Sequence, residues 1–208
     1  MEPGVDYHIE KLDCRHQTSR FSMGPDSDVR PLKSFLQQNA LSYQSANVAV
    51  TYVAALPPLE VGGRSRVIGY ISLTCSEIDL NESYSLEDCE HANRYPSMPA
   101  LKIARLARHA EYSGHRIGEA LVDFAIALAA DYIGPAVGCR FLVTDSKARS
   151  VWFYERAGFT FLDTEENQAR AEPVMFLDLK KLDVEAANED DVELPASSAQ
   201  TEVAQQSE

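Results

Sequence analysis

Two stretches of the chain carry apolar residues at helical spacing. The first is SDVRPLKSFLQQNALSYQ, which begins at Ser27, and its apolar positions are Leu32, Phe35, Leu36 and Leu41. The second follows a glycine-bearing turn, and its apolar positions are Ile117, Leu121, Phe124, Leu128 and Tyr132. Because residues three or four apart lie on one side of an α-helix, each set predicts a helix with one apolar face. The second helix is expected to end near Gly134 and Pro135.

The other apolar runs are typical of β-strands. They lie at residues 47–56, 66–80, 100–112, 137–145, 159–162 and 173–182. The first two runs are joined by PPLEVGGRS, a turn-forming connection, and therefore predict an antiparallel hairpin. We expect a polar loop with a short helix at residues 81–99, and a further short helix at 146–158 that is stopped by Gly158.

The run ALKIARLARHAEY changes phase in its apolar pattern. Its apolar residues fall on odd positions at Leu101 and Ile103, and on an even position at Leu106. One extra residue in a strand moves all later side chains to the opposite face of the sheet. The pattern therefore predicts a β-bulge between Ala104 and Ala107.

The order of these elements, which contains no internal repeat, predicts an α+β fold with helices packed on a mixed sheet. A chain of 208 residues with 45% apolar composition is expected to form one core. We divide it into an N-terminal segment at residues 1–20, a domain at 21–182 and a disordered acidic tail at 183–208.

Charge is distributed unevenly between the body and this tail. The formal net charge is −13, but eight of the 32 acidic residues lie from Asp183 onward, where there is no Lys or Arg. The remaining 24 acidic residues against 19 basic ones leave the body at about −5. The tail has too little apolar surface to offset the entropy of ordering, which favours disorder. It either solubilises the protein or folds back over basic side chains of the body.

Cysteine spacing and hydropathy argue against a metal-binding, disulfide-rich, secreted or membrane-spanning protein. Cys14, Cys75, Cys89 and Cys139 form no C-x-x-C pair and have no histidine at ligand spacing, which argues against a metal site and a disulfide scaffold. The N-terminus lacks the apolar segment of a signal peptide, and we expect no apolar run long enough to cross a bilayer. A cytoplasmic protein without a membrane partner is expected.

The stretch YSGHRIGEAL places Gly114 and Gly118 in front of an apolar helix. A glycine-bearing turn that opens a helix exposes backbone N–H groups, to which a phosphate can bind. The alternative is an ordinary helix start, where His115 and Arg116 form a solvated basic pair that opposes the helix dipole. A bound anion would reverse the sign of that effect.

The block from Ala104 to Leu162 resembles the GCN5-related N-acetyltransferase (GNAT) superfamily, in which an R/Q-x-x-G-x-G/A turn holds the pyrophosphate of acetyl-coenzyme A. The stretches FSMGPDSDVRPLKSFLQQNALSYQSANVAVTYVAA, VIGYISLT, MPALKIARLARH and VWFYERAGF are similar to the toxin-type acetyltransferases of bacterial toxin–antitoxin systems. The resemblance spans about residues 20–180. It implies a GNAT-type, mostly antiparallel twisted sheet with helices packed on it.

The turn departs from the family pattern at two positions. Ser113 stands where Gln or Arg is usual, and Arg116 stands where a middle glycine is common. A guanidinium beside a pyrophosphate is electrostatically favourable, whereas a tilted loop would weaken binding. The residues that the resemblance implies in binding acetyl-CoA are Leu106, Ala107, Arg108, Gly114, His115, Arg116, Ile117, Gly118 and Glu119.

The resemblance also implies a mechanism. Attack of an amine on a thioester creates an oxyanion and a leaving thiolate, so an N–H donor and an acid are needed. The implied donor is the strand backbone at Leu106 to Arg108, and the implied acid is Tyr154, since a phenol with an ordinary pKa of about 10 stays protonated at neutral pH. Without the resemblance, Tyr154 is interpreted as a packing residue, as Trp152 and Phe153 are.

Glu77 and Asp79, at the end of a strand, are the candidate general bases, although carboxylates at such a position are equally typical of a solvated strand end. His109 is another candidate, but a lone histidine beside a loop is more often structural.

Toxin-type relatives acetylate the amino group of aminoacyl-tRNA and are neutralised by a small DNA-binding antitoxin. For this chain, the resemblance implies both partners and a homodimer as a further option. It also implies a basic groove, with the candidates Arg94, Lys102, Arg105, Arg108, Arg140, Lys147 and Arg149. Two alternatives stay open: acetylation of a protein, peptide or small-molecule amine, and a non-catalytic acyl-CoA-binding module.

Overall fold

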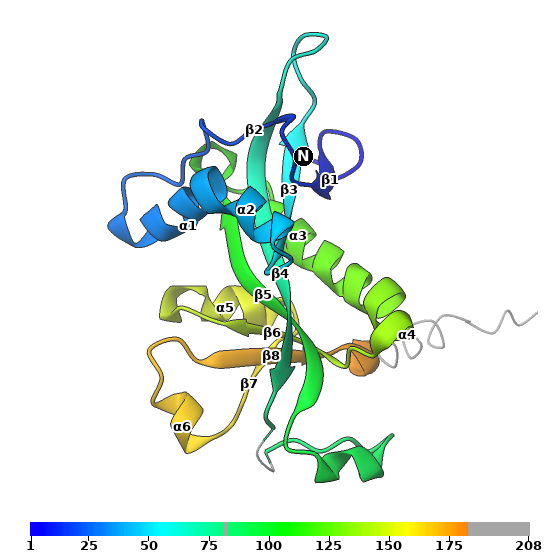
Figure 1. The fold of residues 1–208 in the computed structure, drawn as a ribbon. Helices are drawn as coiled ribbons and strands as arrows, with labels where there is room; N and C mark the ends of the chain where they lie inside the picture. Colours follow the sequence, from blue (N-terminus) through cyan, green and yellow to red (C-terminus); the bar gives the residue numbers. More distant parts are fainter. Residues whose placement is uncertain (81–82, 183–208) are drawn as a thin grey trace, which may run out of the picture.

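An eight-stranded sheet forms the centre of the structure, a computed structural model that describes residues 1–80 and 83–182 (Figure 1). The tail predicted at 183–208 lies outside the described residues. The strands are β1 (His8–Lys11), β2 (His16–Gln17), β3 (Val50–Leu56), β4 (Ser65–Ile78), β5 (Met98–Arg108), β6 (Phe141–Asp145), β7 (Thr160–Phe161) and β8 (Val174–Asp178). Their order is β1-β3-β4-β5-β6-β8-β7, with β2 beside β4.

Most neighbouring strands are antiparallel, as the family resemblance implies. The exceptions are β5 with β6, and the short β2 with β4, which are parallel pairs. The predicted hairpin is confirmed as β3 and β4, whose register runs from Val50 opposite Leu73 to Leu56 opposite Arg66. The fold is therefore the mixed, mostly antiparallel α+β sheet that the resemblance implies.

The helices are α1 (Arg30–Ser34), α2 (Ala40–Ser45), α3 (Ile117–Ala127), α4 (Gly134–Val137), α5 (Val151–Arg156) and α6 (Glu165–Gln168). Two π-helical segments, Phe35–Asn39 and Leu128–Ile133, join α1 to α2 and α3 to α4. The second predicted helix thus continues to Val137, three residues beyond its expected end, and stops where Gly138 adopts a positive φ. The short helix predicted in the 81–99 loop is a 3-10 helix at Glu90–Arg94.

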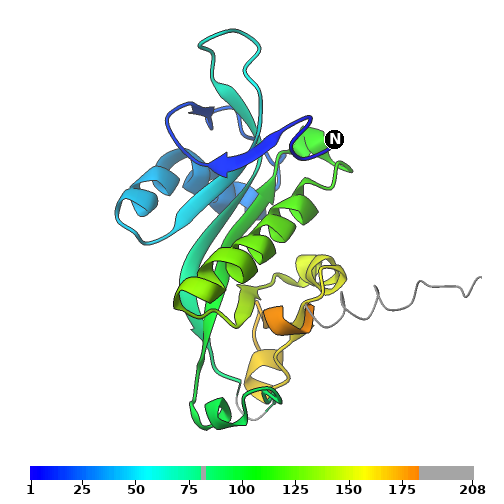
Figure 2. The ribbon, with the colours of Figure 1, turned by 90° about the vertical axis from the view of Figure 1, so that its right-hand side faces the viewer.

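Helices cover both faces of the sheet (Figure 2). The segment from α1 to α2 packs on one face, where its buried residues Phe35, Leu36 and Ala40 meet Val53 and Tyr70. Helix α3 packs on the other face, against Ile68 and Ile71 among others. Its buried side chains are Ile117, Leu121, Val122 and Ala125. Both apolar faces predicted from helical spacing are therefore used to cover the sheet.

A glycine in β4 allows α3 to lie close to the sheet. A Cβ atom added at Gly69 would lie 2.6 Å from Cγ2 of Ile117 and 3.1 Å from Cδ1 of Leu121. Real Cβ atoms do not approach carbon so closely, so any larger residue there would push α3 outward. Because Ile117 is the first residue of α3, Gly69 sets the position of the turn that precedes the helix.

The predicted β-bulge is confirmed. Ser72 of β4 lies opposite Arg105, whereas the next residue, Leu73, lies opposite Ile103. Ala104 is therefore the extra residue on β5, and it lies within the range that the change of phase indicated. A bulge of this kind bends the strand and increases its local twist.

The N-terminal residues contribute a strand that the sequence analysis does not assign. Strand β1 pairs antiparallel with β3, and the neighbouring side chains of Tyr7 and Leu12 are buried. Four residues with weak alternation, HIEK, are too few to be recognised by period alone. The division of the chain at residue 20 stays a prediction.

The helix from Ile117 to Val137 is 21 residues long and apolar enough to cross a membrane by length and composition alone. The sequence analysis expects no such run. In the fold, this helix covers the sheet, because its buried residues belong to the main hydrophobic core.

Candidate active site

Strands β5 and β6 separate after a short stretch of pairing. The two strands pair from Ala100 with Phe141 to Ile103 with Thr144. Beyond the bulge at Ala104, β5 continues along β4 while β6 ends, and a cleft of about 560 Å³ opens between them. Its walls come from the start of α1 on one side and from the start of α5 on the other.

The backbone of β5 faces this cleft at alternate residues. The N–H of His109 donates to the carbonyl of Ile68 at 2.8 Å, which directs the amide groups of His109 and Ala107 toward β4. The amide groups of Leu106 and Arg108 consequently point away from β4, into the cleft. Of the three strand residues that the resemblance implies, Leu106 and Arg108 present backbone N–H donors to the cleft and Ala107 does not.

Arg108 also has an unsatisfied side-chain donor. Its Nη1 is buried and has no hydrogen-bond partner among the described residues, and Arg108 lines the cleft. A buried guanidinium nitrogen without an acceptor is costly, so an anion in the cleft would stabilise it.

The glycine turn lies between a 3-10 helix at Ala110–Tyr112 and α3. Gly114 has a φ of 82°, and Arg116 has a φ of 54°, which is left-handed and uncommon for a residue with a side chain. Among the described residues, the N–H groups from Arg116 to Glu119 donate to no backbone or side-chain acceptor. The turn therefore presents four free donors at the positive end of a helix.

The side chains of the turn lie around these donors. Nε of Arg116 donates to Oε2 of Glu119 at 2.5 Å, and the Arg116 side chain is mostly exposed. Gly118 lines the cleft. A Cβ atom added at Gly118 would lie 3.3 Å from the ring of Phe153, so α3 and α5 pack closely at this point. His115 is exposed, and its ring contacts that of Tyr112.

Tyr154 lines the same cleft from α5. Its side chain is 6% exposed and packs against the rings of Phe153 and Phe159. Burial raises the pKa of Tyr154, and a hydrogen bond with the Thr144 side chain offsets this in part. The phenol is therefore protonated at neutral pH and can act as an acid beside the point where β6 leaves β5.

The neighbouring Trp152 does not pack in the core. Its side chain is 58% exposed, whereas Phe153 is half-buried and belongs to the edge of the main core. The prediction that both are packing residues is thus wrong for Trp152. A six-residue helix turns successive side chains to different sides, so adjacency to a core residue does not imply burial.

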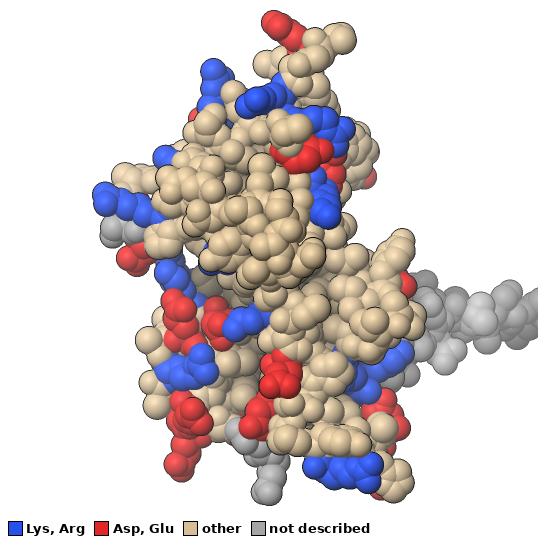
Figure 3. Space-filling view, viewed as in Figure 1, with Lys and Arg blue, Asp and Glu red and all other residues tan. Residues whose placement is uncertain are grey.

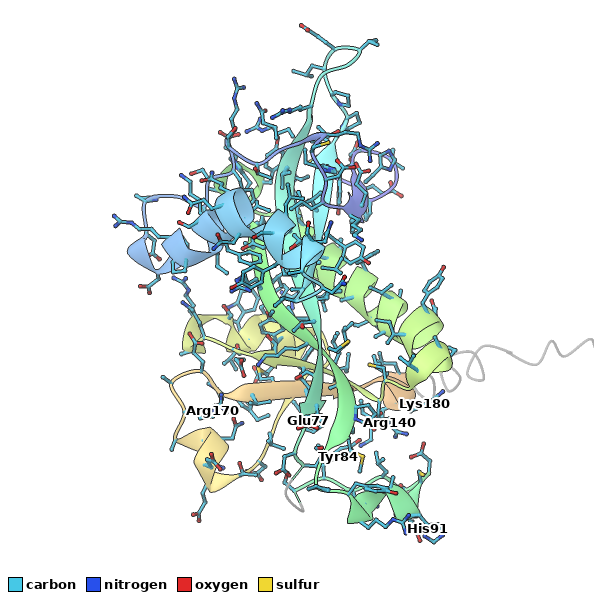
Figure 4. The ribbon with its side chains drawn as sticks, viewed as in Figure 1. Glu77, Tyr84, His91, Arg140, Arg170 and Lys180 are labelled. Atoms are coloured by element: carbon cyan, nitrogen blue, oxygen red, sulfur yellow. The ribbon has the colours of Figure 1, made fainter. Side chains whose placement is uncertain are left out.

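A second hollow, of about 260 Å³, adjoins the cleft and shares Thr144 and Asp145 with it. Asp145 forms two ion pairs. Its Oδ2 lies 2.5 Å from Nζ of Lys102, and its Oδ1 lies 3.7 Å from Nη2 of Arg170. Glu77 lies on the other side of the hollow, where Figure 4 shows it at the end of β4, and it accepts a hydrogen bond from Ser97 at 2.8 Å. The two candidate bases, Glu77 and Asp79, both line this hollow and not the first cleft.

His109 has a structural environment. It is buried, its Nε2 lies 3.2 Å from the carbonyl of Arg20, and its Nδ1 accepts from the N–H of Glu111 at 3.3 Å. Because both ring nitrogens of His109 have partners, the side chain links the end of β5 to the N-terminal segment. This agrees with the interpretation of His109 as a structural residue.

The predicted basic groove is largely neutralised. Arg149 pairs with Asp26 at 2.8 Å, Lys147 with Glu172 at 3.9 Å, and Arg140 with two carboxylates. Arg105 lies over the ring of Phe35 at 3.7 Å. In Figure 3, blue and red side chains alternate below α1 instead of forming one basic surface. The sequence could not reveal this, because most of these partners are distant in the chain.

Comparison with known proteins finds no matching family model and no matching curated protein. Solved structures do match. A Tyr-to-Phe variant of KacT is 20% identical, covers 86% of this chain and 98% of that chain, and has a TM-score of 0.71. AtaT complexed with acetyl-methionyl-tRNAfMet is 22% identical, covers 87% of this chain and 99% of that chain, and has a TM-score of 0.72.

A third match is a Tyr-to-Phe mutant of the AtaT toxin bound to acetyl-CoA and to the C-terminus of the antitoxin AtaR. It is 21% identical, covers 87% of this chain and 98% of that chain, and has a TM-score of 0.67. At these identities the likeness concerns the fold. This chain has the GNAT-type fold that the resemblance in its sequence implies, in the form found in AtaT and KacT.

Proposed function

We propose that this protein is an acetyl-CoA-dependent N-acetyltransferase that acts on the amino group of aminoacyl-tRNA. The observation that carries the proposal is the cleft between β5 and β6, which both Gly118 and Tyr154 line. It combines free backbone donors for phosphate with a protonated phenol for a leaving thiolate.

The residues present fit acetyl-CoA as the donor substrate. The free N–H groups from Arg116 to Glu119 match the oxygens of a pyrophosphate. The unpartnered Nη1 of Arg108 would gain an acceptor from the same molecule. The cleft-facing amides of Leu106 and Arg108 would be available as hydrogen-bond donors to the pantetheine arm.

The chemical step follows from these positions. A neutral amine attacks the thioester carbonyl and forms a tetrahedral intermediate, whose oxyanion accepts a hydrogen bond from a backbone N–H of β5. When the carbon–sulfur bond breaks, the Tyr154 hydroxyl gives its proton to the thiolate. The proton lost by the amine passes to water or to Glu77, which lines the adjoining hollow.

The second hollow supports an acceptor that enters separately from the donor. It meets the cleft at Thr144 and Asp145, so an amine bound there would approach the acetyl group from the side away from the turn. The complexes of AtaT with acetyl-methionyl-tRNAfMet and with AtaR favour a charged tRNA as the acceptor and an antitoxin as a partner in the cytoplasm. The acceptor's α-amine is weakly basic, which lessens the need for a dedicated base.

The test is transfer of radiolabel from acetyl-CoA into charged tRNA, mixed peptides and polyamines, measured side by side. The wild-type protein should label charged tRNA, and Tyr154→Phe should reduce this rate by roughly 10²-fold or more without weakening acetyl-CoA binding. Tyr132→Phe, at a tyrosine that is 70% exposed, is the matched control and should retain the wild-type rate.

Other outcomes select the alternatives. Label only in peptides or polyamines would keep the enzyme and reject aminoacyl-tRNA as its acceptor. Tight acetyl-CoA binding without label in any pool would favour a non-catalytic binding module.

A further inference from the structure

Asp145 stands at the junction of the two hollows of the site. It is the last residue of β6, and among the described residues only Asp145 and Thr144 line both the main cleft and the adjoining hollow of about 260 Å³. Tyr154 lines the main cleft, where the donor is proposed to bind, and the adjoining hollow lies on the side proposed for the acceptor. A ligand atom bound to Asp145 would therefore lie where the two substrates meet.

One oxygen of the Asp145 carboxylate is open to a further donor. Oδ2 lies 2.5 Å from Nζ of Lys102, which fixes that side of the carboxylate. Oδ1 lies 3.7 Å from Nη2 of Arg170, which is too long for a hydrogen bond. The Asp145 side chain is 29% exposed, so Oδ1 can accept a hydrogen bond from a ligand in the hollow.

The charges around the hollow favour an amino group as that ligand. Its lining contains two basic side chains and four carboxylates, which are Lys102, Arg170, Glu77, Asp79, Asp145 and Glu166. This excess of negative charge attracts an ammonium group and repels a phosphate or a carboxylate. Of the four carboxylates, Asp145 alone also lines the main cleft.

The residue before Asp145 holds the proposed acid. Thr144 is buried, and its side chain forms a hydrogen bond with that of Tyr154. Thr144 also donates a hydrogen bond through Oγ1 to the carbonyl of Ile103 at 3.3 Å. Because Thr144 and Asp145 are consecutive residues of one strand, the end of β6 fixes the position of Asp145 relative to the acid.

We propose that Asp145 binds the amino group of the acceptor through Oδ1 and directs its nitrogen toward the acetyl group in the main cleft. An amine held in this position loses less freedom in the transition state, which raises the rate of attack. The inference rests on the proposed function and adds the residue that orients the acceptor. The amine still loses its proton to water or to Glu77, which lines the same hollow.

The test compares two acceptors that differ only at the nitrogen. The first is methionyl-tRNA, and the second is the same tRNA esterified with the α-hydroxy analogue of methionine. Filter binding at pH 6, where an α-amino group is protonated, would be measured in the presence of coenzyme A, which carries no acetyl group. The wild-type protein should bind methionyl-tRNA at least about fivefold more tightly, because a hydrogen bond between two charged groups is stronger than one from a neutral hydroxyl.

Variants separate binding of the amine from support of the hollow. Asp145→Ala should abolish the preference for methionyl-tRNA without changing the affinity for acetyl-CoA, and Asp145→Asn should reduce the preference. Lys102→Met removes the same ion pair but keeps the carboxylate, so it should retain the preference. Asp131→Ala removes an exposed carboxylate outside both hollows and should behave as the wild type.

Several outcomes would overturn the proposal. These are equal binding of the two tRNAs by the wild type, an unchanged preference in Asp145→Ala, and an equal loss of preference in Asp145→Ala and Lys102→Met. The last result would mean that the ion pair only supports the hollow.

Failure of the proposed acceptor is a separate result. If label from acetyl-CoA enters only peptides or polyamines, aminoacyl-tRNA is rejected, and the KM for the labelled amine decides on Asp145. A KM at least about fivefold higher in Asp145→Ala would support its role, and an unchanged KM would overturn it. Absence of label from all three pools would overturn both proposals.

Discussion

Arg140 clamps the buried carboxylate of Asp178 through two hydrogen bonds: Nε donates to Oδ1 at 2.6 Å and Nη2 donates to Oδ2 at 2.9 Å. The hydroxyl of Tyr84 donates to Oδ2 at 2.6 Å, and the Asp178 side chain is 2% exposed. Figure 4 shows Tyr84 and Arg140 near the lower end of the sheet. The cluster joins β8, the residue before β6, and the loop between β4 and β5.

Removing the Asp178 carboxylate should leave the positive charge of the Arg140 guanidinium without its main partner. We expect Asp178→Leu to lower the free energy of unfolding by about 3–5 kcal/mol, measured by urea denaturation. The control is Asp88→Asn, which removes the other carboxylate on Arg140. Asp88 is largely exposed, so this change should lower the free energy of unfolding far less than Asp178→Leu does. If the two variants lowered the free energy of unfolding equally, burial of Asp178 would not be the reason for the loss of stability.

The same cluster predicts how stability depends on pH. Burial raises the pKa of Asp178, but the hydrogen bonds from Arg140 and Tyr84 outweigh burial and hold the pKa below its ordinary value. A carboxyl with a lowered pKa in the folded state contributes stability above its unfolded pKa of about 4, and this contribution is lost as pH falls through the folded pKa. Urea unfolding between about pH 2.5 and pH 7 should therefore show a smaller acid-induced loss for Asp178→Asn than for the wild type.

Gly69 should be intolerant of even one additional methyl group. We expect Gly69→Ala to lower the free energy of unfolding by about 1–3 kcal/mol, because the new Cβ would overlap Cγ2 of Ile117. In a double-mutant cycle, Ile117→Ala should remove most of this extra cost, since it deletes the atom that clashes. Additive effects of the two substitutions would show that α3 does not rest on Gly69.

The left-handed conformation of Arg116 should cost stability. Arg116→Gly is expected to raise the free energy of unfolding by up to about 1 kcal/mol, since glycine adopts a positive φ without a steric penalty. The lost pair with Glu119 is exposed on the Arg116 side and offsets this gain only slightly. Thermal unfolding measures the difference. Arg116→Ala removes the same charge but keeps the Cβ, so it should show no such gain.

Charge pairing around the cleft should limit RNA binding. Asp26→Asn would remove the shorter ion pair of Arg149 and leave only the pair with Asp28 at 4.0 Å. We expect tighter binding of charged tRNA, together with an increase of up to about one in the slope against salt concentration. Filter binding at several salt concentrations measures both quantities. Asp6→Asn makes the same change of charge in the N-terminal turn and should not alter the slope. Identical slopes for all three proteins would argue against Arg149 as an RNA contact.

Local features of this fold were predictable because they depend on neighbours in the chain. Helical spacing places Leu121 on the buried face of α3. The change of phase after Ile103 predicts a bulge between Ala104 and Ala107, and the structure has it at Ala104. Gly114 and Gly118 mark the turn for a similar reason, since a positive φ and close packing favour glycine. Where the pattern was short, as in β1, the same reasoning missed the strand.

The sequence by itself therefore determined the type and order of most elements, the bulge, the turn, and Tyr154 as a candidate acid through family resemblance. Tertiary structure alone decided that Trp152 is exposed, that Arg149 is neutralised by Asp26, and that Arg108 keeps an unsatisfied nitrogen. These properties depend on how segments that are distant in the sequence, such as those of Asp26 and Arg149, lie in the folded chain. Burial and ion pairing depend on contacts between different segments of the chain, so the residue pattern within one segment does not predict them.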